Sequence, residues 1–420
     1  MTGRSVLHRL SPRRLVWSLG LSQIVGYGTL YYAFAILAPS MAATFGWTVP
    51  SVFAILSAAL LASGIISPFA GRCIDRFGSA PVMAAGSAVS AAALLLVAAA
   101  PNGLVFALGV VAVELASPFV QYNAAFALLA ERTGADARRR IVHLTLIAGF
   151  ASTIFWPLTD GLLGVMSWQA IYAIYACLNL LCVPLHLSLR SGAKRFGEAR
   201  APLATPSAET EIAPLPEALR AKALVLVAAG FAFGGFLFSG ISAQLVPLLV
   251  SVGIGGASVL VASLFGPAQV LVRFVNMAGG SKRHPIDATL AAALLLPVAV
   301  LVLAAAAPTV AGAAAFAILL GFGSGLTSIV RGTLPLALFG RHGYGERLGR
   351  ISSAQLVSAA AAPVTLSFLI ERLGAGAALA ALAGLAACGA LCFLAVARLQ
   401  RRAAAGPAAS PEAGRPGSNR

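Results

Sequence analysis

Charged side chains are scarce in this sequence. Of its 420 residues, 10% are charged and 59% are hydrophobic, whereas an average soluble domain carries roughly 25% charged residues. A water-soluble chain of this length could not bury so much apolar surface, because part of any globule faces water. The apolar residues also form long uninterrupted runs, which are typical of helices that cross a lipid bilayer. The composition excludes a soluble domain and predicts a membrane protein.

Motifs of enzymes and of metal sites are also lacking. The sequence contains no Gly-x-Ser-x-Gly, no His-Glu-x-x-His and no phosphate-binding loop. We therefore predict no enzyme, no cofactor and no ATP-driven pump. The five cysteines lie mostly in apolar runs, where small packing residues without disulfides are expected. A soft-metal pair at Cys388 and Cys392, which share one helical face, is the alternative.

The basic residues are arranged asymmetrically. The net charge of +16 would indicate nucleic-acid binding in a soluble protein, but the Lys and Arg residues lie between apolar runs, on alternate sides of them. If the N-terminus is cytoplasmic, only Arg273, Arg331 and Arg372 of the 29 basic residues fall outside cytoplasmic segments. This asymmetry predicts a multi-pass protein of the cell inner membrane with both termini in the cytoplasm, and no nucleic-acid partner.

Twelve apolar segments are long enough to span a bilayer, since a helix needs about 20 residues to cross ~30 Å of hydrocarbon. We expect an all-α membrane protein with 12 transmembrane helices in two six-helix halves, an arrangement known from transporters with parallel halves. The expected spans are 15–38, 49–70, 81–100, 104–130, 141–164, 168–189, 223–250, 257–278, 288–307, 309–338, 351–371 and 376–397.

A polar segment rich in proline separates the halves, and the C-terminal tail is rich in Ala, Pro, Gly and Ser, a composition typical of disorder. The expected organisation is a cytoplasmic N-terminus (1–14), an N-terminal six-helix bundle (15–189), a cytoplasmic linker (190–222), a C-terminal six-helix bundle (223–397) and a disordered cytoplasmic tail (398–420).

A short motif follows the second span. It reads Gly71-Arg72-Cys-Ile-Asp75-Arg76-Phe-Gly78, and it resembles the Gly-x-x-x-Asp-Arg-x-Gly loop of the major facilitator superfamily. Two glycines permit a tight turn, and an acid in a basic loop can cap a helix N-terminus or attract Arg72 or Arg76. The resemblance implies a cytoplasmic latch between the two halves. The alternative is an ordinary charged loop.

Two further stretches are similar to that superfamily. Residues 149–164 resemble the fifth-helix pattern of many antiporters, although Trp168-Gln169 stands where a Trp-Arg pair is usual. Phe45-Gly46-Trp47 resembles the monocarboxylate and oxalate–formate porter branch, and arsenite-efflux permeases are similar in general texture. In that branch an Arg in helix 8 and a Lys in helix 11 bind substrate carboxylate. Arg273 matches the arginine of helix 8, but the predicted helix 11 (351–371) contains no Lys or Arg.

The second half departs from the motif as well. The equivalent loop, 279–283, reads Gly-Gly-Ser-Lys-Arg and lacks the aspartate. Because the predicted helix 351–371 lacks the second substrate-binding cation of that branch, a dicarboxylate substrate is not expected.

Four ionisable residues lie inside the expected spans, where charge is costly and usually faces a cavity or a partner. A buried carboxyl favours its protonated form, so Glu114 is either a proton or substrate site or a buried structural acid. Arg273 can bind an anion bidentately or pair with the latch. Asp160 and Arg331 favour structural or gating roles. By resemblance, all four helices line or flank the central cavity.

Uncharged polar residues recur on the same helices. Gln23, Tyr27 and Tyr31 are spaced by four and share one face, which favours cavity lining over packing. The remaining cavity candidates are Gln121 and Asn123 in the fourth span, Trp156 in the fifth, Gln269 in the eighth and Gln355 in the eleventh.

The resemblance implies secondary active transport of a small molecule, in some cases anionic, by alternating access, with proton coupling and a monomeric protein in the bilayer. Three alternatives stay open. They are a facilitated efflux permease for drugs or for metalloid or organic anions, a transport-inactive membrane sensor with the same fold, and an intramembrane enzyme, which would need clustered acids or histidines that the sequence lacks.

Overall fold

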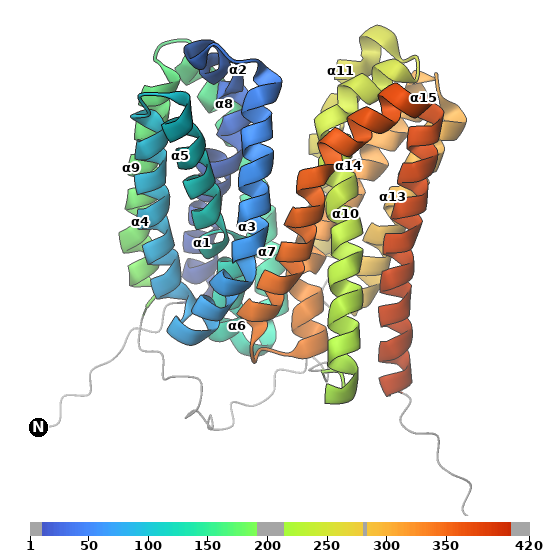
Figure 1. Cartoon of the computed structure of the whole chain (residues 1–420). Helices are drawn as coiled ribbons and strands as arrows, with labels where there is room; N and C mark the ends of the chain where they lie inside the picture. Colours follow the sequence, from blue (N-terminus) through green and yellow to red (C-terminus); the bar gives the residue numbers. More distant parts are fainter. Residues whose placement is uncertain (1–10, 191–213, 280–283, 405–420) are drawn as a thin grey trace, which may run out of the picture.

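The computed structural model describes residues 11–190, 214–279 and 284–404, and every regular element within them is a helix (Figure 1). The predicted all-α fold class is thus confirmed. Predictions for the rest of the chain lie outside the described residues: the start of the N-terminus, most of the linker, all but the first residue of the 279–283 loop and the end of the tail.

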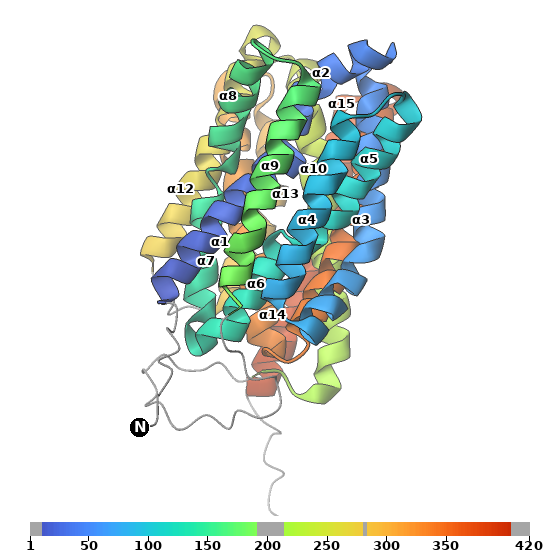
Figure 2. The same ribbon diagram turned by 90° about the vertical axis from the view of Figure 1, so that its left-hand side faces the viewer.

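The N-terminal half forms one bundle and the C-terminal half forms another beside it (Figure 1), and Figure 2 shows the N-terminal bundle in front of the C-terminal one. The first contains α1 (Pro12–Tyr27), a π-helical segment (Gly28–Tyr32), α2 (Ala33–Phe45), α3 (Val49–Phe77), α4 (Ser79–Ala98), α5 (Gly103–Ala116), a 3-10 turn (Ser117–Phe119), α6 (Tyr122–Thr133), a second 3-10 turn (Gly134–Asp136), α7 (Ala137–Ala148), α8 (Ala151–Leu163) and α9 (Trp168–Ser188). The second contains α10 (Glu217–Ser251), a 3-10 turn (Gly255–Ala257), α11 (Ser258–Ser263), α12 (Phe265–Ala278), α13 (Pro285–Ala306), α14 (Val310–Phe339) and α15 (Tyr344–Ala404).

Helix ends coincide with residues suited to them. Thr48 and Asn102 cap α3 and α5, because their side-chain oxygens accept hydrogen bonds from the N–H groups of Ser51 (3.3 Å) and Val105 (3.0 Å). These bonds satisfy donors that the first turn leaves free. Gly46 ends α2 in the left-handed region, with φ 66°, a conformation that glycine adopts at little cost.

Ten stretches of the described residues are long and apolar enough to cross a membrane. One of them, Gly103–Leu163, turns back at Gly134–Asp136 and therefore holds two crossings. α15 also reverses, at Gly374 (φ 81°, ψ 164°), so that its first part rises and its second part descends (Figure 1). With both reversals counted, the helices agree with the twelve crossings predicted.

Helices extend beyond the predicted limits at both ends of the C-terminal half. α10 begins at Glu217 rather than at 223, since Pro216 directly precedes an acidic first turn that the helix dipole favours. α15 continues to Ala404, so the first residues of the predicted disordered tail are helical. Arg401 and Arg402 lie in its last turn, where basic side chains favour a helix.

The two bundles share an apolar core at the lower end in Figure 1, the end at which α1 begins and α15 stops. Phe126 and Ile141 of the first bundle cluster there with Tyr344 and Leu348 of the second. At the upper end the buried cores are separate. Phe106 belongs to a cluster of N-terminal residues, and Phe316 to a cluster of C-terminal residues. Burial therefore joins the bundles at the lower end.

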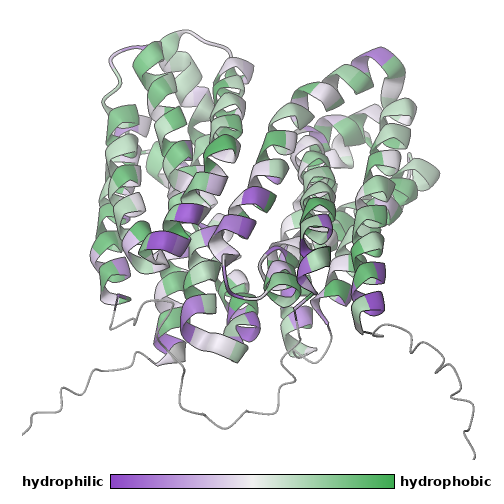
Figure 3. Ribbon diagram, turned by 60° about the horizontal axis from the view of Figure 1, so that its bottom comes forward, coloured by the Kyte–Doolittle hydropathy of each residue, from purple (hydrophilic) through white to green (hydrophobic). Residues whose placement is uncertain are grey.

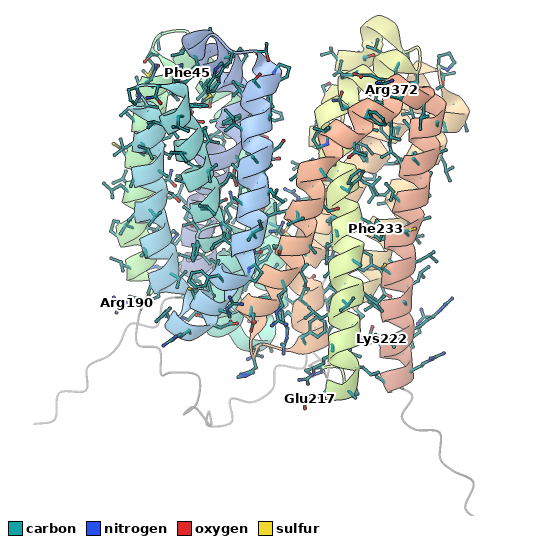
Figure 4. The ribbon with its side chains drawn as sticks, in the orientation of Figure 1. Phe45, Arg190, Glu217, Lys222, Phe233 and Arg372 are labelled. Atoms are coloured by element: carbon teal, nitrogen blue, oxygen red, sulfur yellow. The ribbon has the colours of Figure 1, made fainter. Side chains whose placement is uncertain are left out.

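The outer surfaces fit a lipid environment. Hydrophobic residues cover most of the helix length, and hydrophilic ones gather toward the lower end (Figure 3). Large apolar side chains such as Trp17 (66%) and Ile65 (68%) are exposed, as expected where lipid replaces water. Arg190 and Lys222 lie at the lower end, whereas Arg372 lies at the upper end (Figure 4).

Candidate functional site between the two bundles

α3 packs closely against the first part of α15 at the lower end. A Cβ atom on Gly71 would overlap the carbonyl oxygen of Gly345, and one on Gly349 would overlap that of Ser67. Small residues let two membrane helices approach to backbone contact. These positions form a close seam between the bundles, because each pair joins one residue from either half.

The 71–78 motif lies at the end of this seam, but its structure differs from the predicted loop. Residues 71–77 are the last turns of α3, and the turn is made by Gly78 alone (φ 86°). The Asp75 carboxylate accepts hydrogen bonds from the backbone N–H groups of Gly345 (2.9 Å) and Glu346 (2.8 Å). Asp75 thus caps the N-terminus of α15, in the opposite bundle.

The arginines of the motif do not pair with Asp75. Arg72 lies 3.9 Å from the Glu346 carboxylate, and the Arg76 guanidinium lies over the Phe77 ring at 5.3 Å. Both contacts are peripheral to the seam, and the exposed Arg72 pair contributes little stability.

One acid that the sequence interpretation did not single out adjoins the motif. The Glu131 carboxylate, at the end of α6, accepts a hydrogen bond from the Ser79 N–H (3.1 Å) and so caps α4. Glu131 precedes Arg132 in a basic segment. The signal that drew attention to Asp75, an acid among basic residues, would have found it.

Asn123 connects the two bundles above the seam. Its Oδ1 accepts hydrogen bonds from Arg331 Nη2 (3.2 Å) on α14 and from Ser352 Oγ (3.1 Å) on α15. Asn123 and Ser352 are buried, and the buried Nε of Arg331 has no hydrogen-bond partner. The sequence predicts Asn123 and Arg331 as site residues, and the structure places them in contact.

Arg273 makes a second polar connection between the bundles. Its guanidinium donates to the backbone carbonyl oxygen of Thr145 on α7 and to Gln269 Oε1 on α12, both at 3.4 Å. The side chain is 8% exposed, and its Nε has no partner. Gly149 leaves space for it, since a Cβ there would overlap the guanidinium.

No ion pair joins either guanidinium to a carboxylate among the described residues. A buried cation without a counter-ion is costly. Arg273 and Arg331 therefore leave an excess of positive charge where the bundles meet.

Aromatic residues of the first bundle face these cations. Ring centroids are 4.7 Å apart for Tyr27 and Tyr122, 5.3 Å for Tyr31 and Tyr32, and 5.9 Å for Tyr32 and Trp156. The hydroxyl groups of Tyr32 and Tyr122 lie within electrostatic range of Arg273, and those of Tyr27 and Tyr122 within range of Arg331. The Tyr27, Tyr32 and Tyr122 hydroxyls thus share an electrostatic environment with the two guanidinium groups.

Two irregular segments shape this part of the first bundle. The π-helical turn Gly28–Tyr32 lies in the first crossing. Residues 117–121, which include a 3-10 turn with Pro118, interrupt the α-helix of the fourth crossing. Gln23 Nε2 donates to the carbonyl oxygen of Val120 (2.8 Å), a backbone group that the interruption frees. Gln23 is buried, and this hydrogen bond holds the interrupted segment of the fourth crossing against α1.

Other candidate residues lie apart from the two arginines. Glu114 is 3% exposed within the first bundle, beside a cavity of about 10 Å³ lined by Leu30, Phe34 and Tyr172 among others. No described residue donates a hydrogen bond to it or pairs with its charge. Asp160 is exposed on α8.

Two glutamine positions complete the set. Gln121 is partly buried and begins α6 without capping it through its side chain. Gln355 packs against Gly235, and its buried Oε1 has no partner. Gln355 thus adds an unsatisfied acceptor on the C-terminal side.

Comparison with known proteins identifies the class of this fold. The family model described as Major Facilitator Superfamily matches residues 19–329. The chain therefore belongs to the major facilitator superfamily, a family of membrane transporters, and this family and its multiple apolar helices make it a multi-pass membrane protein. Comparison with curated protein sequences gives no match.

Solved structures of the same fold include transporters for different solutes. The human organic anion transporter MFSD10 (TETRAN) matches with a TM-score of 0.70 and 16% identity, over 91% of this chain and 99% of that one. The major facilitator superfamily transporter FucP, in the outward conformation, matches with a TM-score of 0.68 and 16% identity, over 92% of this chain and 97% of that one. The proton:xylose symporter XylE matches with a TM-score of 0.66 and 12% identity, over 90% of this chain and 94% of that one. At these identities the likeness shows the fold alone.

Proposed function

We propose that this protein is a secondary active transporter that carries a small organic anion between the two bundles by alternating access. The observation that carries the proposal is the pair of guanidinium groups of the buried Arg273 and the partly buried Arg331, without a carboxylate partner in the described structure. An anionic solute would supply the missing countercharge, and guanidinium groups bind carboxylates through two parallel hydrogen bonds.

The described conformation suits one half of such a cycle. The bundles share a buried core at the lower end and have separate cores at the upper end. We assign the lower end to the cytoplasm, because the basic side chains Arg190 and Lys222 lie there. The conformation would then accept solute from the outer side of the cell inner membrane.

A transport assay with Arg273 variants tests the anion proposal. Proteoliposomes containing the purified chain are screened for uptake of labelled monocarboxylates, sulfonates and neutral solutes. We expect the wild-type protein to take up anions. Arg273→Gln should lower the rate of anion uptake by about tenfold or more, because a buried charged hydrogen bond to the anion is removed. Arg273→Lys keeps the charge without the planar fork and should retain part of the activity.

The matched control is Arg372→Gln, an exposed upper-end arginine that lies over the Phe368 ring. It should transport at the wild-type rate. Uptake of neutral solutes alone, unaffected by Arg273→Gln, would contradict the proposal.

We further propose proton coupling through Glu114. Its carboxyl is buried beside apolar side chains and near the Tyr31 and Tyr172 rings, without a cation to balance a charge, and such burial favours the neutral acid. A conformational change that exposes the group to water would release the proton.

The proton proposal is tested with an imposed pH gradient. Glu114→Gln should abolish gradient-driven accumulation while exchange of solute at equal pH continues. Glu371→Gln, at an exposed position, is the control and should accumulate solute normally. Unchanged accumulation in Glu114→Gln would exclude this residue as the proton carrier and leave the anion proposal intact.

A further inference from the structure

The aromatic side chains near Arg273 form a continuous wall on the first bundle. Tyr31, Tyr32 and Trp156 contact in sequence, with ring centroids 5.3 and 5.9 Å apart and interplanar angles of 75° and 89°. Tyr31 is 45% exposed and Trp156 is 48% exposed. A large part of these rings is therefore available to another molecule.

Two observations associate this wall with the side of the first bundle that meets Arg273. Gly149, in the turn between α7 and α8, leaves space for the Arg273 guanidinium of the second bundle, and Trp156 lies in the second turn of α8, further along the same crossing. Trp156 also contacts Tyr32, whose hydroxyl lies in electrostatic range of Arg273. The Tyr32–Trp156 pair thus lies on the part of the first bundle that adjoins Arg273.

Charge decides which π-binding solute fits beside these rings. Aromatic walls often bind organic cations, but Arg273 and Arg331 would repel a cation at this position. A neutral ring would bind the wall and leave the buried Arg273 guanidinium uncompensated. A ring that carries a carboxylate satisfies both features, because the ring packs against Trp156 while the carboxylate accepts from Arg273.

We infer that the substrate class is aromatic carboxylates, with Trp156 and Tyr32 as the residues that select the ring and Arg273 as the residue that binds the carboxylate. The inference rests on the proposed function, since it specifies the anion of the same site. It adds that the protein distinguishes a flat π-system from a saturated ring of the same charge and similar size.

Binding of benzoate and cyclohexanecarboxylate to the purified full-length chain tests the inference by calorimetry. Wild-type protein should bind benzoate about 3- to 10-fold more tightly, which is the range that aromatic pairing contributes. Trp156→Leu should remove this preference and leave cyclohexanecarboxylate binding unchanged, whereas Trp156→Phe should keep most of it. Trp17→Leu, on a 66% exposed surface of α1, is the matched control and should behave as wild type.

The outcomes separate the two proposals. Equal binding of both probes by wild type, or equal weakening of both in Trp156→Leu, overturns the aromatic selectivity while anion transport stands. Binding of benzyl alcohol as tight as that of benzoate overturns the anion proposal itself. If Trp156→Leu does not fold, Tyr32→Leu gives the same comparison, and the wild-type preference is measured independently of any variant.

Discussion

At the scale of single residues, Asn123 holds a central position, because one carboxamide oxygen accepts hydrogen bonds from two helices of the opposite bundle. In the proposed alternating-access cycle these bonds would break when the lower end opens, so their strength would set part of the barrier to opening.

Asn123→Asp should strengthen this connection. A carboxylate facing Arg331 forms a charge-assisted hydrogen bond, which is roughly twice as strong as a neutral one. We expect the lower-closed conformation to be stabilised, with transport slowed by about tenfold and an increased melting temperature. Transport rate and thermal denaturation in detergent measure both effects.

Asn179→Asp is the matched control for this change. Asn179 is equally buried but donates its amide hydrogens to Thr29 and to the Tyr175 carbonyl within one bundle. A carboxylate there loses both donors, so the melting temperature should fall. A fall of the same size in Asn123→Asp would show that Asn123 does not link the bundles as described.

Sequence alone identified several of the residues that meet in the site, but not all. Arg273, Arg331 and Asn123 are conspicuous because polar groups are costly in lipid. Tyr32 was missed, since spacing by four from Gln23 selects Tyr27 and Tyr31. The π-helical turn places residues five apart, rather than four, on one face of the helix. The ring centroids of Tyr27 and Tyr32 are therefore 6.4 Å apart.

At the scale of elements, the junction of α13 and α15 depends on a neutral histidine. His284 Nδ1 accepts the Ile286 N–H (3.0 Å) and caps α13, which requires a ring without a proton on Nδ1, and His284 Nε2 lies 2.7 Å from Gln400 Nε2 on α15. Burial lowers the pKa of His284, and Arg138 lowers it further, while Asp287 acts in the opposite direction.

This histidine predicts a pH dependence of stability. Since the folded state favours neutral His284, its contribution is complete above the ordinary His pKa of about 6.5. It is lost as the pH falls from there toward the lower pKa of the folded protein. The melting temperature should therefore decrease over this range.

His284→Asn provides the comparison, because asparagine caps a helix without titrating. The variant should show a shallower decrease than wild type over the same pH range. Identical slopes would assign the pH dependence to other groups. Thermal denaturation at several pH values measures the difference.

Element positions were predictable to a large degree, whereas element interruptions were not. Long apolar runs place helices because lipid leaves few alternatives for the backbone. The fourth crossing was predicted as one helix over 104–130, yet it is interrupted at 117–121. Pro118 is the local sign, but the bond from Gln23 to the Val120 carbonyl depends on tertiary packing.

At the scale of the whole molecule, the seam between α3 and α15 controls how the bundles separate. Gly71→Ala should loosen it, because the added Cβ overlaps the Gly345 carbonyl. We expect Ser352, which is 1% exposed, to become accessible from the lower side. A Ser352→Cys reporter, in a background without the five native cysteines, is labelled with an impermeant maleimide in inverted vesicles.

Gly384→Ala is the control, since a Cβ there meets nothing within 4 Å. Its labelling should match that of the reporter alone, while Gly71→Ala should increase the rate about tenfold. Equal rates in the two variants would show that the seam does not govern the lower opening.

The contact at Asp75 has an asymmetric consequence for sequence variation. The carboxylate binds backbone amides of residues 345 and 346, and an amide is present whichever side chain follows it, except that of proline. Position 75 must therefore keep a carboxylate, whereas positions 345 and 346 need only side chains small enough to fit. A family that diverges widely could preserve such a joint by retaining one acid and little else.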